Sequence, residues 1–373
     1  MKWMFWGSVA LLAYTYAGYA CWLWLRARCC VRPVKRAPYT PSISLVMVVR
    51  NEDAVLEEKI ENLLALDHPA DRFQIVIVSD GSTDGTEAIL RSYAHDERFC
   101  VILNQFSQGK ASGLNCGIEL AKGEVILFTD ARQEIETGAV RLLLENFADA
   151  SVGCASGQLI LGSAGEGEAG EGMGLYWRIE KKIRQWESCS GSVVGATGAL
   201  YAARRDLLVP VPAGTILDDV YLPMNIARQG FRVIFDSRAR AWDNPDLGAA
   251  REFGRKVRTL SGNYQLLQLA PWLLAAKNPL RFEFVSHKLL RLAAPFALLA
   301  LLLASASVGE PIYRAALVLQ FAFYGLGLLA MAPLKLGPLA RIADAAFTFV
   351  VLNTAAVVAF GNFVAGRKVA WSR

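Results

Sequence analysis

The sequence predicts an α/β fold, with a mixed and mostly parallel sheet flanked by helices, together with transmembrane helices. Aliphatic and β-branched runs at 42–49, 74–79 and 124–129 predict buried strands, and helix-like segments follow the first two at 55–66 and 87–93. Strands that alternate with helices indicate βαβ units and parallel pairing. In addition, 54% of the chain is hydrophobic and its mean hydropathy is +0.30, which is high for a purely soluble protein.

Each predicted strand is followed by an acidic residue. Glu52 follows the first strand, Asp80 ends the second and Asp130 follows the third. In an open α/β sheet, ligands bind at the carboxyl ends of the strands. Asp80 and Asp84 belong to a glycine-containing turn that lacks the Lys-Ser/Thr ending of a P-loop, so it suits a nucleoside better than its phosphates. Taken alone, the turn could equally be a surface turn without a ligand.

The N-terminal segment predicts a membrane anchor over 1–27. Residues 3–25 carry no charge, and a bilayer span takes roughly 20 residues. A basic cluster follows at 26–36, which favours an uncleaved anchor with the next domain, 38–262, in the cytoplasm. A cleaved signal peptide is the alternative, but it would be shorter and would carry its positive charge first.

The C-terminal region, 288–365, predicts further spans. Apolar stretches occur at about 289–308, 312–333 and 342–364. Three crossings from a cytoplasmic domain would place the basic tail, 366–373, outside, against the usual charge bias. Either the last stretch is re-entrant or interfacial, or the tail breaks the bias.

Residues 263–287 are apolar, contain prolines and carry basic residues, as interfacial helices do. The net charge of +5 fits membrane-proximal lysine and arginine and gives no case for nucleic acid. Seven cysteines lack metal-ligand spacing, and three histidines argue against a histidine-based metal or nucleophile mechanism.

Other residues suit a ligand that carries phosphate or a flat ring. Lys110 stands beside a glycine, where it could reach a phosphate or uracil oxygen; a solvated surface lysine is the alternative. The glycine-rich segment 162–174 predicts a flexible loop or lid. The helix expected at 175–187 carries aromatic residues, and the small residues at 195–199 would let the backbone approach a sugar ring or form a tight strand turn.

Asp218 and Asp219 stand together at a predicted helix start. They could be an N-cap and a first-turn acid that favour the helix dipole. The segment 255–258 places Arg255 and Arg258 three residues apart on a helix, which forms a cationic stripe able to hold a diphosphate or lipid headgroups.

In order along the chain, these motifs resemble membrane-bound family 2 glycosyltransferases, which include cellulose, hyaluronan and poly-N-acetylglucosamine synthases. The motifs are Asn-Glu, Asp-Gly-Ser-Thr-Asp-Gly, Gly-Lys-x-x-x-Leu-Asn, a strand ending in Asp, a glycine-containing acceptor loop and Asp-Asp. The resemblance covers about 42–265. It implies a GT-A fold, a nucleotide-sugar donor (UDP-linked in these synthases), inverting chemistry and Mg2+ or Mn2+.

The resemblance also implies roles for matching residues. Asp219 would be the catalytic base, with Asp218 beside it, and Asp130 would bind the metal. The expected contacts with the nucleotide-sugar are Glu52, Asp80, Asp84, Lys110, Asn115, Asp130, Arg255 and Arg258. The expected contacts with the acceptor are Tyr176, Trp177, Thr197 and Gly198.

The chain departs from the family pattern at several positions. Arg132 replaces the second acid of the Asp-x-Asp metal motif, which weakens the case for a metal. Lys256 stands at an arginine position, and Thr259 replaces the tryptophan of Gln-Arg-x-Arg-Trp, which puts a cellulose-synthase-like polymer channel in doubt.

We therefore expect an inverting transferase that moves a sugar to a growing polysaccharide or another membrane-associated acceptor. Two alternatives are a transferase that adds one sugar to a lipid carrier and a non-catalytic subunit that binds nucleotide or glycan. The expected location is a bacterial-type inner membrane, crossed several times. Membrane lipids and subunits of an export complex are expected partners.

Overall fold

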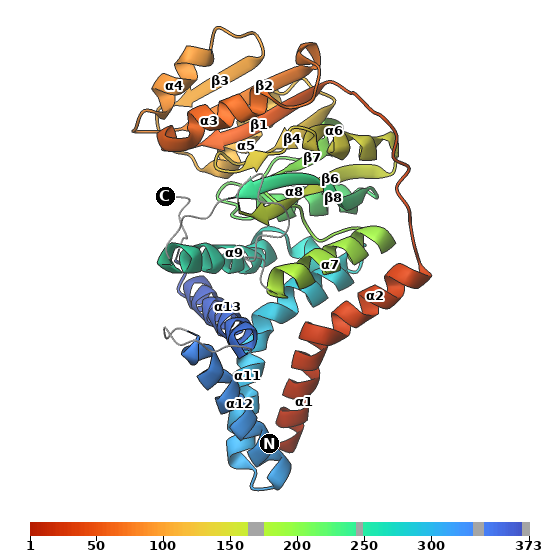
Figure 1. The fold of residues 1–373 in the computed structure, drawn as a ribbon, viewed down its shortest axis with the longest axis vertical. Helices are drawn as coiled ribbons and strands as arrows, with labels where there is room; N and C mark the ends of the chain where they lie inside the picture. The colour runs from red at the N-terminus through yellow and green to blue at the C-terminus, as the bar shows by residue number, and fades with distance from the viewer. Residues whose placement is uncertain (163–174, 244–248, 331–338, 368–373) are drawn as a thin grey trace.

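The molecule is arranged in three tiers in the computed structural model (Figure 1). The sheet domain lies at one end, α7 (Leu175–Ser190) and α9 (Ala249–Leu269) form a middle layer, and a slender group of helices extends from the other end. The structure describes residues 1–162, 175–243, 249–330 and 339–367. The predicted loop or lid at 162–174 therefore lies almost wholly outside the described residues.

The sheet has eight strands in the order β3-β2-β1-β4-β7-β6-β8-β5. Pairs β1/β2, β2/β3, β1/β4 and β6/β8 are parallel, whereas β4/β7, β6/β7 and β5/β8 are antiparallel. The mixed, mostly parallel sheet is confirmed, and the three predicted strands correspond to β1, β2 and β4. The strand bounds are Ile43–Val49, Phe73–Asp80, Phe99–Asn104, Val125–Phe128, Glu134–Ile135, Val152–Leu161, Tyr201–Arg204 and Arg232–Asp243.

The reversed strand β7 determines which loops meet at the edge of the sheet where β1, β2 and β4 end. Its first residue, Tyr201, is paired with Phe128, the last residue of β4. The loop that enters β7 therefore lies where β4 ends. Because β6 and β8 run parallel to each other and opposite to β7, their carboxyl ends reach this same edge.

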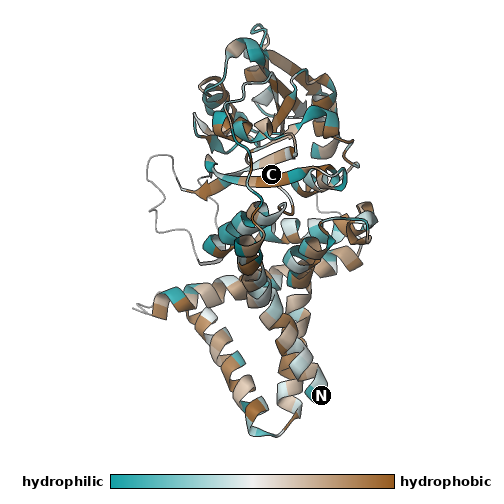
Figure 2. Cartoon of the chain, turned by 90° about the vertical axis from the view of Figure 1, so that its right-hand side faces the viewer, coloured by the Kyte–Doolittle hydropathy of each residue, from teal (hydrophilic) through white to brown (hydrophobic). Residues whose placement is uncertain are grey.

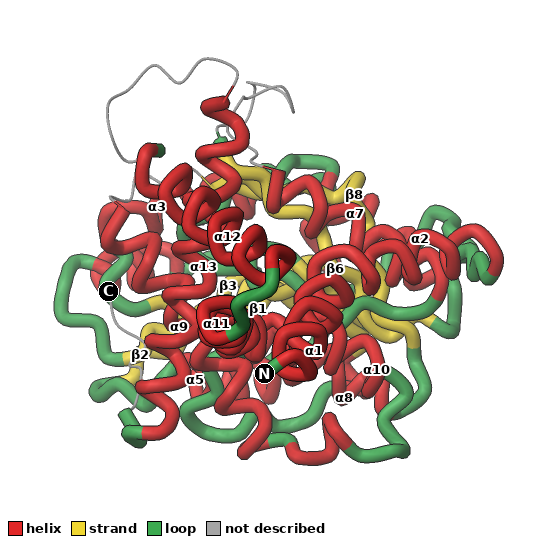
Figure 3. The backbone as a smooth tube through the Cα atoms, turned by 90° about the horizontal axis from the view of Figure 1, so that it is seen from below, coloured by secondary structure: helices red, strands yellow, loops and turns green. Residues whose placement is uncertain are grey.

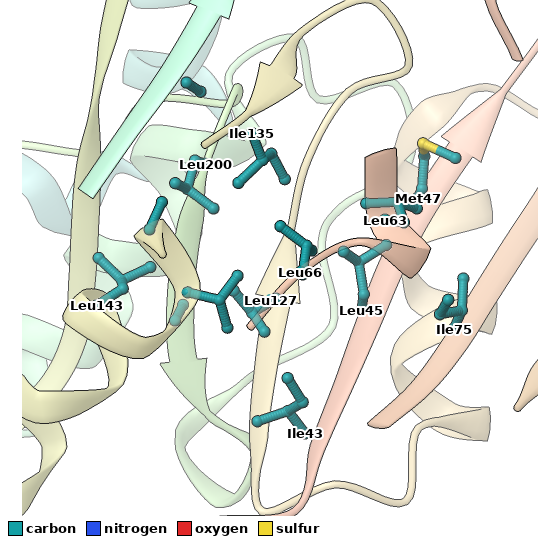
Figure 4. Close-up of a cluster of buried hydrophobic side chains, with 14 of the residues drawn as sticks. Ile43, Leu45, Met47, Leu63, Leu66, Ile75, Leu127, Ile135, Leu143 and Leu200 are labelled. Atoms are coloured by element: carbon teal, nitrogen blue, oxygen red, sulfur yellow. The ribbon is translucent and has the colours of Figure 1, made fainter. Parts of the chain in front are cut away.

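Helices cover both faces of the sheet because each presents an apolar stripe to it. On one face, α3 (Asp53–Leu64) and α6 (Ala139–Leu144) enclose a core that includes Leu45, Leu127 and Leu143 (Figure 4). The other face is covered by α5 and α8, and also buries apolar residues from the middle layer. The second core therefore joins the sheet domain to the helices below it. The bounds of α4, α5, α8 and α10 are Thr86–Tyr93, Lys110–Leu120, Asp218–Arg228 and Arg281–Phe284.

Three described helices are long and apolar enough to cross a membrane: Arg281–Ser307, Pro311–Leu329 and Ala340–Val364. The first joins α10, the π-helix η6 (Val285–Leu289) and α11 (Leu290–Ser307), and the others are α12 and α13. They form the brown and pale stem in Figure 2. They correspond to the three predicted stretches, although the first begins inside the segment expected to be interfacial.

The N-terminal helix runs without a break through α1 (Lys2–Ala13), the π-helix η1 (Tyr14–Gly18) and α2 (Tyr19–Cys29). Figure 3 shows α1 beside α11, and Phe5 packs edge-on against Tyr313 with ring centroids 4.7 Å apart. This helix is not among the three candidate spans in the described part of the chain. Its role as an anchor stays a prediction.

Candidate active site

The turns after β1 and β2 are bonded to each other. Asn51, with φ of 54°, accepts a hydrogen bond from Thr83 N at 2.8 Å, and Asp53 accepts one from Gly85 N at 3.2 Å. In return, Asp84 accepts bonds from the backbone N–H groups of Asp53 and Thr86. Burial alone would raise the pKa of Asp84, but the bonds from Thr86 and Asp53 outweigh it and lower the pKa. Asp84 thus fixes the two turns together.

Asp80 anchors the loop that leads into α5. Its carboxylate accepts hydrogen bonds from Ser107 Oγ at 2.6 Å, Gln108 N at 2.7 Å and Gly109 N at 2.9 Å. The residue is 0% exposed. The next residue, Gly81, has φ of 65° and a Cβ there would lie 2.5 Å from Ser107 N, so only glycine fits. The expected contact between Asp80 and a nucleoside stays a prediction.

Glu52 lies at the amino end of α3, where its backbone N–H donates to Thr86 Oγ1 at 2.8 Å. Its side chain is half-buried. Asn115 bonds both ends of its amide to the backbone of Val211, each at 2.8 Å. The structure thus uses Asn115 to hold the segment before α8, and its expected contact with the donor stays a prediction.

Lys110 is the first residue of α5 and reaches the carboxyl end of β4. Its Nζ donates to Asp130 Oδ1 at 2.8 Å and lies 3.5 Å from Asp218 Oδ1. The lysine side chain is 15% exposed and that of Asp130 is 42% exposed. Burial alone would lower the pKa of Lys110, but Asp130, Asp218 and Asp219 outweigh it and raise the pKa. Lys110 is therefore a fixed cation within a carboxylate group and not a solvated surface lysine.

Asp218 and Asp219 occupy the first turn of α8. The N-cap position is Leu217 and has no side-chain capping bond, so neither acid is the cap. Burial raises the pKa of Asp218, with Lys110 opposing it. Burial and the neighbouring Asp218 raise the pKa of Asp219 to about 6. The pair therefore holds a proton more readily than ordinary carboxylates do.

Gly198 lies close to both Asp130 and Asp219. A Cβ at this position would be 3.3 Å from Asp130 Oδ2 and 3.7 Å from Asp219 Oδ2. The neighbouring Thr197 N–H donates to Ser156 Oγ at 3.0 Å, which fixes the loop to β6. The predicted acceptor loop thus passes next to Asp130 and Asp219.

Two buried polar atoms near this centre make no hydrogen bond to the described residues. They are the hydroxyl of Tyr201, which is 1% exposed, and Nε of Arg258. The carboxylates of Asp218 and Asp219 act on the pKa of Tyr201, which burial raises, and the charge of Arg258 acts on Asp218. Both atoms are buried donors to which the described residues supply no acceptor.

Arg255 and Trp177 are two further predicted site residues. Arg255 lies 3.6 Å from Asp243 and 3.5 Å from Glu252. Trp177 is 36% exposed on α7, and the side chain of Tyr176 lies outside what the structure describes. Their binding roles stay predictions.

Arg132, at the divergent position of the metal motif, forms an ion pair with Asp243 at the end of β8. Its Nη2 lies 3.0 Å and 3.3 Å from the two carboxylate oxygens, and Asp243 is 1% exposed. Gln133 Nε2 also donates to Asp243, at 3.3 Å. The arginine thus neutralises a buried acid that comes from a distant part of the chain.

Lys59 is a residue that the sequence analysis missed. It is 3% exposed, and its Nζ donates to Thr129 Oγ1 at 3.1 Å and to Gln133 O at 2.5 Å, so it braces the segment that carries Asp130. Burial lowers the pKa of Lys59 to about 7, against the opposing charge of Asp130. The signal was present, because Lys59 shares the apolar face of α3 with Leu56 and Leu63.

Known proteins that resemble this chain are glycosyltransferases and polysaccharide synthases. Residues 44–209 match the Glycosyl transferase family 2 profile. Poly-beta-1,6-N-acetyl-D-glucosamine synthase of Staphylococcus aureus (strain COL) is 23% identical over 236 residues, which cover 60% of this chain and 55% of the relative. The probable glycosyltransferase YdaM of Bacillus subtilis (strain 168) is 24% identical over 216 residues, covering 54% of this chain and 50% of YdaM. The chain spans about half the length of these curated relatives.

Among solved structures, the mannosyltransferase PcManGT from Pyrobaculum calidifontis, in complex with GDP-Man and Mn2+, has a TM-score of 0.73 at 22% identity. The match covers 96% of this chain and 97% of that one. The chain therefore has a GT-A fold, together with helices that are long and apolar enough to cross a membrane. Residues 44–209, which match the Glycosyl transferase family 2 profile, lie within this fold.

Proposed function

We propose that this protein is an inverting glycosyltransferase that moves a sugar from a nucleotide-sugar to a membrane-associated acceptor. The observation that carries the proposal is the meeting of Lys110, Asp130 and Asp218 at one sheet edge, with Gly198 against Asp130 and Asp219. Cations beside carboxylates suit a diphosphate leaving group and an acid–base step. The three apolar helices support an acceptor that is held at a membrane, with the catalytic domain on its cytoplasmic side.

Asp219 is the proposed general base. Inversion requires a base beside the acceptor hydroxyl, and Asp219 adjoins the loop at Gly198. Its pKa of about 6 leaves it mostly ionised at neutral pH, with a basicity suited to taking a proton. Asp218 is more deeply buried, at 4% exposure, and faces Lys110. Asp218 therefore holds the Lys110 ammonium in place and raises the basicity of Asp219.

Asp130 fits a divalent cation that binds together with the diphosphate. No described group of three or more His, Cys, Asp or Glu side chains could hold a metal by itself. However, Mg2+ is commonly held by one or two carboxylates together with substrate phosphates and water, and Asp130 is 42% exposed. When bound, the cation would neutralise charge on the leaving diphosphate. Lys110 and Arg258 supply positive charge from the chain itself.

The donor and the product length are open to direct measurement. The Staphylococcus aureus relative is named as a poly-beta-1,6-N-acetyl-D-glucosamine synthase, which supports an N-acetylglucosamine donor and a polymer. PcManGT was solved with GDP-Man and Mn2+, so GDP-mannose is included among the donors to be tested. Membranes containing the full chain are incubated with each nucleotide-sugar, and nucleotide release and product size are followed with and without a chelator. Absence of nucleotide release with every donor, despite a folded protein, would contradict the proposed enzyme.

A further inference from the structure

The third apolar helix, α13 (Ala340–Val364), does not follow the other two candidate spans. Figure 1 shows it directly beneath α9, whereas α11 and α12 continue to the lower end of the stem beside the N-terminus, and Figure 2 shows the same heights from the side. A helix of 25 residues is about 37 Å long at 1.5 Å per residue. This length would take α13 through the whole bilayer if it ran along the stem.

A cluster at the lower end of the stem gives a reference for height. It joins Phe5, Ala304 and Tyr313, so α11 and α12 both rise from it. The two helices stay level, because Gln320 Nε2 of α12 donates to Leu298 O of α11 at 3.0 Å. Both of these residues lie about 10 Å above the cluster, counted at 1.5 Å per residue along each helix. Heights along the two helices can therefore be compared.

Two contacts of α13, about 21 Å apart along its axis, both lie high on the stem. Near its start, Ala346 packs on α12, where a Cβ at Gly327 would lie 3.2 Å from Ala346 C. Near its end, the ring centroid of Phe360 lies 5.0 Å from that of Phe296 on α11. Gly327 and Phe296 lie about 21 Å and about 12 Å above the cluster. The height of α13 thus changes by only about 9 Å between the two contacts, so the helix runs closer to the membrane plane than to the membrane normal.

Charged residues place the start of α13 at the upper edge of the apolar layer. Arg291 of α11, about 20 Å above the cluster, forms an ion pair with Glu180 of α7 at 2.8 Å. No residue between Arg291 and the end of α11 is charged. On α13, Arg341 and Asp344 precede the contact with α12, and both are exposed. Charged side chains near the end of an apolar helix reach the headgroup region, so the start of α13 lies at that depth.

Helix α9 covers one face of α13. Tyr264 of α9 stacks on Phe363 with ring centroids 5.3 Å apart, and Ala359 is fully buried in the same cluster. Val357 and Val364, by contrast, are 47% and 68% exposed. A helix that lies in the membrane surface normally turns a polar face to water. Here α9 takes the place of water, which explains how so apolar a helix can lie flat.

The charges that flank α13 agree with this placement. Lys335 and Arg341 precede most of the helix, and Arg367, Lys368 and Arg373 follow it. If α13 crossed the membrane, one of these basic groups would lie outside, against the usual charge bias. A helix that stays within one leaflet leaves both groups on the side of the sheet domain.

Helix α9 also joins α13 to the candidate active site. A Cβ at Gly262 of α9 would lie 2.5 Å from Leu217 Cγ, and Leu217 directly precedes Asp218. Gln265 Oε1 of α9 accepts a hydrogen bond from Ile216 N at 2.9 Å. The start of α8 therefore rests on α9, which in turn packs on α13.

We propose that α13 lies within the bilayer leaflet on the side of the sheet domain, with lipid acyl chains against its exposed face, and does not cross the membrane. It supports α9 and, through α9, holds the acidic pair of α8 at the membrane surface. Of the three candidate spans, α11 and α12 then cross. The inference concerns placement in the membrane, so its test is separate from that of the proposed reaction.

The test maps the two sides of the membrane with the full chain in a bacterial inner membrane. Green fluorescent protein, which becomes fluorescent in the cytoplasm, and alkaline phosphatase, which is active only outside it, are each placed after Arg373, within 331–338 and at Gly309. We expect fluorescence without phosphatase activity at the first two positions, and the reverse at Gly309, between α11 and α12. Phosphatase activity after Arg373 with fluorescence within 331–338 would show that α13 crosses. That pattern, or any other than the expected one, would overturn the proposal.

Cysteine labelling gives a second measurement without a large reporter. Ser372→Cys and Gly309→Cys are treated with a membrane-impermeant maleimide in cells whose outer membrane is permeable, and again after the inner membrane is opened. Labelling of the seven native cysteines in the unmodified chain is subtracted. We expect Ser372→Cys to gain its labelling only after opening, and Gly309→Cys to be labelled before it. Equal labelling of both variants before opening would place the tail outside and contradict the proposal.

Discussion

The proposed donor half and the proposed acceptor half of the site are built in different ways. In the donor half, short turns follow β1 and β2, and their side chains bond to neighbouring backbone, as Asn51 does to Thr83. In the acceptor half, the loop at Gly198 is held between α8, β6 and α7, far apart along the chain. The first half depends on local strand–turn chemistry, whereas the second depends on the reversed strand β7. Substitutions in the two halves should therefore affect different kinetic constants.

The largest effect is expected for Asp219→Asn, which removes the proposed base and leaves a side chain of similar size. We expect transfer to fall by about 100- to 10,000-fold, the usual contribution of general base catalysis, while donor affinity changes little. The measurements are kcat and the donor Kd. Asp218→Asn is the informative partner, because its carboxylate faces Lys110 and its loss should also weaken donor binding. Unchanged turnover in Asp219→Asn would remove this residue from the role of base.

Lys110→Met should have the next largest effect, and on the donor half. It removes the cation that lies 2.8 Å from Asp130 and leaves three acids without their central counter-charge. We expect kcat to fall by about 100- to 1,000-fold, as for the loss of other groups that stabilise transition-state charge. The matched control is Lys122→Met, at an exposed lysine just beyond α5. Equal losses in both variants would indicate a nonspecific cause.

The sequence predicts the donor half of the site better than the acceptor half. Glu52, Asp80 and Asp130 could be placed at one edge because each directly follows a strand-like run, and parallel strands end together. Lys59 could also have been found, because a lysine on the apolar face of α3 must be buried with a partner.

The long-range contacts around the site offer no such local signal. The pairing of Arg132 with Asp243 joins residues that are 111 positions apart. The place of Arg184 behind Thr197, where both donate to Ser156 Oγ, depends on how β6 and β7 pair. Arg132 departs from the family pattern, and Arg184 lies in an ordinary amphipathic helix. Only the folded chain brings these residues to their partners.

The pH dependence sharpens the assignment of the base. Burial and the charge of Asp218 raise the pKa of Asp219 to about 6, and a base works only when it is unprotonated. The rate should therefore be constant at neutral pH and fall about tenfold per pH unit below 6. The measurement is kcat/KM from about pH 3.5 to 8 with fixed ionic strength. A limb near pH 4, the range of an ordinary carboxylate, would argue against the buried pair.

Gly198→Ala should have a smaller effect that is confined to the acceptor half. Its new methyl group would lie 3.3 Å from Asp130 Oδ2 and 3.7 Å from Asp219 Oδ2, which crowds the space for an acceptor without blocking folding. We expect the acceptor KM to rise several-fold, with the donor KM and the melting temperature nearly unchanged. Gly254→Ala is the control, because a Cβ there meets nothing within 4 Å. A larger change in the donor KM than in the acceptor KM would mean that the Gly198 loop belongs to the donor half.

The smallest effect is expected for Asn51→Ala, which loosens the donor turns. The variant loses the 2.8 Å bond to Thr83 N and places alanine at φ of 54°, a region that asparagine tolerates better. One neutral hydrogen bond contributes about 0.5–1.5 kcal/mol, so the donor KM should rise about two- to tenfold. Asn51→Gly removes the same bond but relieves the backbone strain, so it separates the two causes. If either variant raised the acceptor KM and left the donor KM unchanged, the division of the site into two halves would be wrong.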